Sequence, residues 1–213
     1  MPLPNNSIPE RLIVGILAQE DHQFFEHTGV NWRLLLESLK KILRTGSASQ
    51  GASTIPMQVS SLCYRSVDKL SERNRLSGVI RKISEFIDAS LMVFYSSREE
   101  ILRAYVSLVP LIPEAPEGTG ERGFLVAARY YFQKELKDCS VTDQWRLILT
   151  LRNRVDLNPD LLASFDNLSI RDREILRRAQ FRQKSVVKKY GDLIRSLRFV
   201  EADLSHVMIP ETM

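Results

Sequence analysis

The sequence predicts an all-α protein, and three observations support this fold class. Apolar residues recur at helical spacing in several long stretches. Glycine, proline and small polar residues gather between these stretches, where they mark turns and loops. No stretch alternates apolar and polar residues over the length of a strand, and the chain has no internal repeat.

The first predicted helix begins near Ser7. This residue and Glu10, three positions later, match a capping box, and Pro9 is tolerated at the start of a helix. The apolar positions that follow the helical period are Ile8, Leu12, Ile16 and Leu17. Gly29 is expected to end this region in a turn.

The middle of the chain predicts three more helices. One spans 32–43, and another spans 76–94 after the small, polar loop at 46–54. The first of these carries Leu35, Leu36, Leu39, Ile42 and Leu43 at helical spacing. Ser97 with Glu100 can cap the third, which runs to about Val109.

The remainder of the chain predicts a long loop and then further helices. Residues 110–123 are rich in proline and glycine, and 123–136 is periodic again. Thr142 can cap a helix that runs through Leu151, and Asn158-Pro159 ends the segment after it. The stretch 169–199 is basic and periodic. We therefore expect one compact domain over 7–165 and a basic helical C-terminal extension over 166–213.

Composition restricts the function only loosely. The chain has 213 residues and a formal net charge of +4, which fits an anionic partner such as phosphate or a membrane surface, although charge alone favours a solvated basic surface. The spacing of His22, His27 and His206 matches no metal motif. No apolar run approaches the roughly 20 residues that span a bilayer, and residues 1–6 lack the features of a signal peptide. The chain either works inside the cell or is a fragment without its anchor.

One cluster of polar residues follows the first helix. Glu20, Asp21 and His27 bracket Phe24 and Phe25. Acidic residues at the end of an apolar helix ordinarily form only its solvated cap. A carboxylate there also faces the negative end of the helix dipole, which makes it a better base.

Five segments of the chain resemble the signatures of one enzyme family. Residues 20–30 resemble E-D-x-x-F-x-x-H-x-G-V, and 50–55 resemble Q-G-G-S-T-I. Residues 81–85 resemble R-K-x-x-E, and 101–107 resemble I-L-x-x-Y-x-N. Residues 123–132 are similar to the G-x-x-A-A-x-x-Y-F helix beyond them. In these motifs and in their order, which cover the chain from residue 8 to about 160, the chain resembles the peptidoglycan glycosyltransferase (transglycosylase) domain of penicillin-binding proteins and monofunctional biosynthetic transglycosylases.

The resemblance implies a lysozyme-like helical domain with a long cleft. Its donor is a growing glycan on a lipid pyrophosphate, and its acceptor is a lipid-linked disaccharide, whose 4-hydroxyl attacks the donor's anomeric carbon with inversion. Glu20 corresponds to the family's general base, and Glu85 to the glutamate beside the departing pyrophosphate, which acts alone or through a magnesium or manganese ion. No cofactor is otherwise required. The resemblance places the protein at the periplasmic face of a bacterial inner membrane, with other cell-wall synthesis proteins as further partners and no role for nucleic acid.

Cations and hydroxyls near the departing phosphate lower the barrier to its departure. Arg81 and Lys82 lie one helical turn before Glu85, so they share its face, although a surface ion pair would show the same spacing. Ser53 and Thr54 can cradle a phosphate, or form a turn before a helix. The full set of expected substrate-binding residues is Asp21, Phe24, His27, Gln50, Gly51, Ser53, Thr54, Gln58, Arg81, Lys82 and Arg98.

The chain departs from the family pattern at several positions. Ser61 stands where the second signature's lysine would fall, and Ser107 replaces the fourth signature's asparagine. Arg98 replaces a lysine and keeps its charge, and Gln133 replaces a glycine. Three functions remain open: an active glycosyltransferase, a catalytically weak or inactive module that binds cell-wall precursors or partner proteins, and a glycan-cleaving enzyme. The last has no obvious use for the second and third signatures.

Two further expectations concern geometry. Glu20 and Glu85 should line one groove, with Arg81 beside the pyrophosphate. The helix at 32–43 combines Trp32 and leucines with Lys40, Lys41 and Arg44, which suits a membrane interface. It suits a plain core helix equally well, in which case most of the leucines should be buried.

Overall fold

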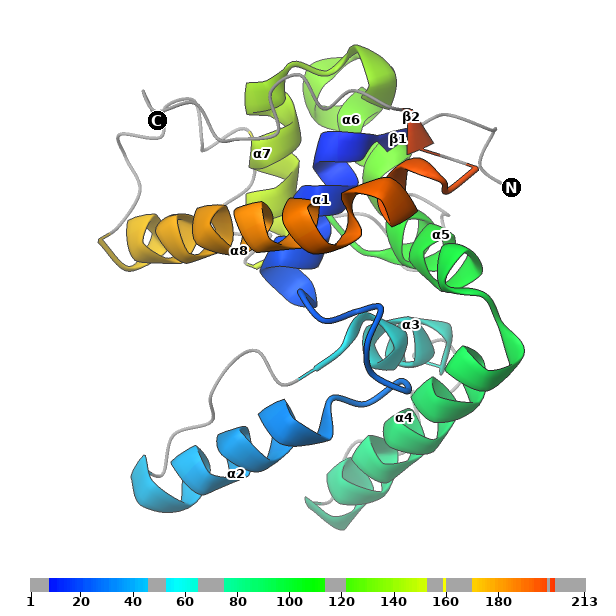
Figure 1. Cartoon of the computed structure of the whole chain (residues 1–213), viewed down its shortest axis with the longest axis vertical. Helices are drawn as coiled ribbons and strands as arrows, with labels where there is room; N and C mark the ends of the chain where they lie inside the picture. Colours follow the sequence, from blue (N-terminus) through cyan, green and yellow to red (C-terminus); the bar gives the residue numbers. More distant parts are fainter. Residues whose placement is uncertain are drawn as a thin grey trace. The chain divides into compact units, whose positions relative to one another are not determined.

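The computed structural model describes residues 8–45, 53–64, 75–113, 122–152, 159, 170–198 and 200–201. Its helices confirm the all-α class (Figure 1). They are α1 (Glu10–Glu20), α2 (Trp32–Thr45), α3 (Ile55–Tyr64), α4 (Arg75–Tyr95), α5 (Arg98–Leu108), α6 (Gly123–Phe132), the 3-10 helix η1 (Leu136–Asp138), α7 (Val141–Thr150) and α8 (Ile170–Arg195). Within these ranges, no helix has both the length and the apolarity needed to cross a membrane.

Two very short strands accompany the helices. β1 (Ile8–Pro9) pairs in parallel with β2 (Val200–Glu201), with Ile8 opposite Val200. Two residues are too few to show the alternation that reveals a strand, so the sequence did not predict this pair.

The chain folds as two compact units, and the first comprises residues 1–22 and 109–213. Its centre is α1, which is buried continuously from Leu12 to Ala18. A helix that is apolar on all sides needs cover on all sides, and α1 packs against α7 and α8. Gly15 permits this close packing, because a Cβ there would collide with the Cδ1 atom of Ile148 in α7. The boundary expected at residue 165 stays a prediction, but α8 packs on α1 within this unit.

The second unit comprises residues 23–108. In it α3 packs against α4 and α5. Val30, Met57 and Ala89 form a buried apolar cluster, which Leu35 and Phe86 partly cover. This cluster joins the loop before α2, which holds most of the first signature, to α3 and to α4, which carries the third signature.

The helix ends confirm some of the predicted caps and correct others. Ser97 and Glu100 form the expected reciprocal cap of α5, and the backbone and side-chain hydrogen bonds from Ser97 lower the pKa of Glu100. The cap expected at Thr142 is wrong, because Ser140 caps α7 in a capping box with Asp143. The expected helix over 123–136 is also too long.

The helix predicted over 123–136 is α6, and it ends at Phe132. The next residue, Gln133, adopts a left-handed conformation with φ of 54°, and its N–H closes the last turn on the Arg129 carbonyl. At the start of α1 the N-cap residue is Pro9, which has no side-chain cap, and Ser7 lies outside the described residues.

Candidate functional site

The first signature ends in a loop that fits tightly against α4. Gly29 has a φ of 101°, which confirms the predicted turn. A Cβ at this position would meet the Ala89 backbone and lie 2.7 Å from the Ser90 nitrogen. Only glycine avoids both the left-handed strain and this clash, so it allows the loop to lie directly on α4.

Thr54 joins the second signature to the same loop. Its hydroxyl donates to the Gly29 carbonyl at 2.5 Å and accepts from the Met57 N–H at 3.4 Å, where it caps α3. The side chain is buried, with 2% of its surface exposed. Both bonds serve the protein's own backbone, so this structure gives Thr54 a linking role, and the expected phosphate contact stays a prediction.

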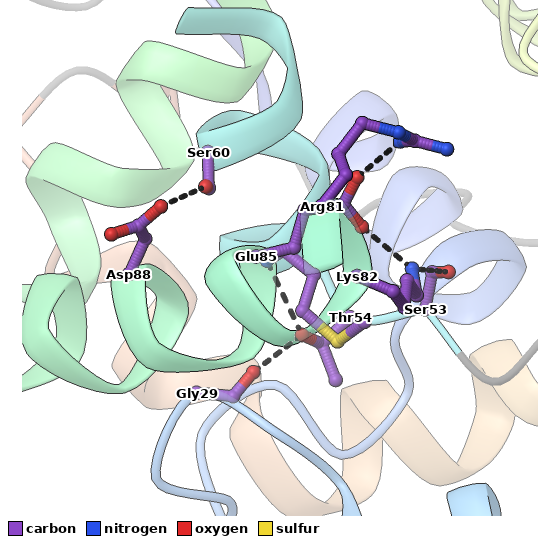
Figure 2. A network of polar contacts seen from close by, with 9 residues as sticks. Gly29, Ser53, Thr54, Ser60, Arg81, Lys82, Glu85 and Asp88 are labelled. Carbon is purple, nitrogen blue, oxygen red and sulfur yellow. Dashed lines mark hydrogen bonds and ion pairs between the residues drawn. The ribbon is translucent and has the colours of Figure 1, made fainter. Parts of the chain in front are cut away.

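Four side chains from the second and third signatures form what we call the α4 cluster: Ser53, Arg81, Lys82 and Glu85 (Figure 2). A guanidinium nitrogen of Arg81 lies 2.5 Å from one Glu85 oxygen, and the Lys82 Nζ lies 2.7 Å from the other. The same ammonium donates to the Ser53 hydroxyl at 3.4 Å. Ser53 and Lys82 are far apart in sequence, so this contact brings two signatures together.

The charges of the α4 cluster are arranged asymmetrically. The Glu85 side chain is only 7% exposed, whereas those of Arg81 and Lys82 are 56% and 40% exposed. One buried carboxylate therefore holds two cations that remain open to solvent, and the three residues carry a net positive charge. Charge-assisted hydrogen bonds from such cations suit a phosphate oxygen. The arrangement equally satisfies the surface ion-pair interpretation of the same spacing.

Arg98 supports the first-signature loop from α5. Its guanidinium donates to the His27 carbonyl and lies over the Phe24 ring, 5.3 Å from the ring centre. His27 in turn accepts from the Gly29 N–H through Nδ1 at 3.2 Å. Phe24 is buried, at 1% exposed. In this structure these residues hold the loop in place, and their roles as substrate contacts stay predictions.

The other expected site residues are placed as follows. Glu20 is the last residue of α1, at the negative end of the helix as the sequence predicted, and its side chain is half-buried. Asp21 is buried and ends the helix with a bond from its N–H to the Leu17 carbonyl. Gln58 accepts from the Tyr105 hydroxyl at 3.5 Å. Gln50 and Gly51 lie outside the described residues, and the shared groove for Glu20 and Glu85 stays a prediction.

Two polar residues of this unit were missed by the sequence interpretation. Asn31 is buried, accepts from the Leu34 N–H at the start of α2, and donates to Gln23 at 2.8 Å. An asparagine directly before a periodic stretch is a recognised helix-start signal, so it could have been found. The Ser60 hydroxyl donates to Asp88 at 3.3 Å and joins α3 to α4 (Figure 2), a pairing that no local pattern indicates.

Comparison with known proteins agrees with the signatures. The transglycosylase family model matches residues 2–180. Penicillin-binding protein 1B of Buchnera aphidicola is 28% identical over 92% of this chain, and penicillin-binding protein 1A of Vibrio cholerae is 33% identical over 66% of it. The biosynthetic peptidoglycan transglycosylase of Janthinobacterium is 28% identical over 71%.

The matched segments make up 24%, 15% and 59% of these three relatives, so the chain spans only part of each one. The transglycosylase family model, however, covers most of this chain, and the described helices carry the third and fourth signatures in order. The chain therefore belongs to the transglycosylase family, with the family's all-α, lysozyme-like class of fold.

Proposed function

We propose that this chain is a peptidoglycan glycosyltransferase that polymerises a lipid-linked disaccharide into glycan strands and releases the lipid pyrophosphate. The observation that carries the proposal is the α4 cluster, in which the second and third signatures meet around one buried carboxylate and two exposed cations. Family membership and the names of the relatives support the same activity.

In the proposed reaction the acceptor's 4-hydroxyl attacks the anomeric carbon of the donor. A sugar hydroxyl is a poor nucleophile, so Glu20 removes its proton as the new bond forms. The bond from the anomeric carbon to the pyrophosphate breaks, and negative charge develops on the departing phosphate oxygen. Arg81 and Lys82 stabilise that charge, and Glu85 holds both cations in position.

A divalent cation at the pyrophosphate stays a prediction. Both Glu85 oxygens already face cationic groups, one from Arg81 and one from Lys82. Among the described residues, no three histidine, cysteine or acidic side chains gather as a metal site. These residues do not offer a ready ligand set for a metal ion, and the charge stabilisation in the proposed reaction comes from Arg81 and Lys82.

Replacing Lys82 with glutamine tests the role of the α4 cluster. The change removes one charge-assisted bond to the pyrophosphate, worth about 1.5 kcal/mol or more, so the affinity for the lipid-linked disaccharide should fall at least about tenfold. Binding of labelled substrate in detergent measures this directly. Lys82→Arg should keep most of the affinity, and Lys137→Gln, on an exposed residue of η1, should change nothing. Equal binding by the parent and Lys82→Gln would remove Lys82 from the substrate site.

A second function, a binding module without catalysis, is favoured by one observation. Ser61 stands on α3 where the family has a lysine, so one expected phosphate contact is missing. In that case the parent protein would bind the lipid-linked disaccharide, lose affinity in Lys82→Gln, and yet release no lipid pyrophosphate. Release of that product by the parent distinguishes the two functions.

We also propose that α2 contacts a membrane at the periplasmic face of the inner membrane. Its leucines are not mostly buried, as a plain core helix requires: Leu36 is 56% and Leu43 is 86% exposed, while Leu35 packs partly on the core. Trp32 and the α4 residues Ile87, Leu91 and Phe94 line an open apolar groove beside α2. An amphipathic helix with exposed leucines and basic residues suits the bilayer interface.

The double variant Leu36→Ser/Leu43→Ser tests this contact. Because both side chains are exposed in the protein, the free energy of unfolding should change little. Partitioning into phosphatidylcholine vesicles should fall about tenfold or more, since two apolar side chains no longer enter the interface. Leu35→Ser should instead lower the melting temperature, because Leu35 packs on the apolar cluster. Unchanged partitioning of the double variant would show that membrane contact comes from elsewhere.

A further inference from the structure

Positive charge is concentrated in α8. Its 26 residues include nine lysines or arginines and three acidic residues, a net charge of +6, whereas the whole chain has a formal net charge of only +4. The rest of the chain is therefore slightly acidic, and the basic character of this protein comes from one helix. The family match ends at residue 180, so most of this helix lies beyond it.

The two faces of α8 differ sharply. Gln183, Val186, Tyr190 and Ile194 are buried and lie on one side of the helix. The helix itself packs on α1 (Figure 1). The opposite face, which we call the basic face, carries Arg177, Phe181, Lys184 and Lys188, and all four are exposed. Their separations of four, three and four residues align them along one side of the helix over about 16 Å.

Among the described residues, no acidic side chain neutralises the charge of the basic face. Two other arginines of α8 are paired, Arg178 with Glu174 at 3.0 Å and Arg195 with Asp192. Within the described part of the chain, no ion pair involves Arg177, Lys184 or Lys188. Phe181 lies among these cations with 78% of its surface exposed. A solvated charged surface needs no phenylalanine at its centre, so this ring points to a partner that is both anionic and apolar.

We propose that the basic face of α8 binds the surface of a bilayer that contains anionic phospholipids. Such a bilayer offers negative headgroups to the three cations and acyl chains to the Phe181 ring. The aliphatic stems of lysine and arginine can lie along the apolar boundary of the bilayer while their charged ends stay with the headgroups. The proposal does not depend on the glycosyltransferase activity, and it differs from the α2 contact in requiring negative lipid charge.

Vesicle binding with matched variants tests the proposal. The probes are vesicles of phosphatidylcholine with and without phosphatidylglycerol, and the quantity measured is the ratio of the two partition coefficients. Each basic residue near an anionic surface contributes about a factor of five, so Lys184→Gln/Lys188→Gln should lower that ratio about 30-fold. Lys184→Arg/Lys188→Arg should restore it, and added salt should weaken it. Phe181→Ser should lower binding to the anionic vesicles about tenfold.

Each outcome has a defined meaning. All three positions are exposed, so circular dichroism should show the parent's melting temperature in every variant. An anionic-to-zwitterionic ratio that is the same in the parent and in the glutamine variant overturns the proposal. Tight binding to a soluble polyanion such as single-stranded DNA, with no preference for anionic vesicles, also overturns it. Loss of the preference in the glutamine variant alongside unchanged release of lipid pyrophosphate supports it and separates it from the proposed catalysis.

Discussion

Glu20→Gln is expected to reduce glycan chain growth by about 100- to 10,000-fold, the usual contribution of a general base. Glutamine has nearly the same shape as glutamate but cannot accept the proton of the attacking hydroxyl. Glu20 is the last residue of α1, at the negative end of the helix dipole, where a carboxylate becomes a better base. Rates of disaccharide consumption by parent and variant measure the effect.

The matched control for this variant is Glu26→Gln. Glu26 is an exposed carboxylate six residues later, at a position where the first signature tolerates any residue. It should retain the parent's rate, and both variants should give the parent's circular dichroism spectrum. A Glu20→Gln protein that elongates glycan at the parent's rate would contradict the assignment of Glu20 as the general base.

Glu85→Gln is expected to lower chain growth about 100-fold. The carboxylate holds Arg81 at 2.5 Å and Lys82 at 2.7 Å, and a neutral amide would release both cations from their positions. Displacing a charge-stabilising group by about 1 Å is sufficient for a loss of this size. The free energy of unfolding should fall by no more than about 1 kcal/mol, because both cations are already largely exposed.

Glu37→Gln is the control for Glu85→Gln. Glu37 forms an ion pair with Arg33 at 3.3 Å, with the same four-residue spacing as Arg81 and Glu85, but on α2 and with both partners exposed. If the α4 cluster is only a surface ion pair, the two variants should behave alike and both retain activity. A loss in Glu85→Gln alone identifies a positioning role for this carboxylate.

The helices were largely predictable because their signals are local. The apolar period located α2 and α4 within one or two residues, and the Ser97–Glu100 cap was identified from spacing alone. One error, the cap of α7, lies where two local signals compete. Ser140 and Thr142 are both capping residues, and only Ser140 has an acidic partner three residues later, at Asp143.

The candidate site was predictable in its residues and less so in their contacts. The spacing of Arg81, Lys82 and Glu85 predicts a shared helical face, which the ion pairs confirm. The sequence does not predict which oxygen accepts the hydrogen bond of the Thr54 hydroxyl. That bond, to the Gly29 carbonyl, depends on how closely the loop approaches α4, and such long-range packing has no local signature.

The basic stretch at the C-terminal end shows the same limit. Its charge and helical period were evident, but which side would face α1 could not be read from charge alone. The structure buries Val186, Tyr190 and Ile194, which leaves Phe181 outside among the cations. A phenylalanine in a periodic helix is ordinarily expected in the core, so only packing reveals its exposure.

The most direct test of the central claim is glycan synthesis by the parent protein. Purified chain is incubated with labelled lipid-linked disaccharide in detergent, and the products are separated by length. The account predicts a ladder of glycan strands that grows with time, depends on Glu20, and is accompanied by released lipid pyrophosphate. A folded protein that binds the disaccharide and yields only unreacted substrate would contradict it.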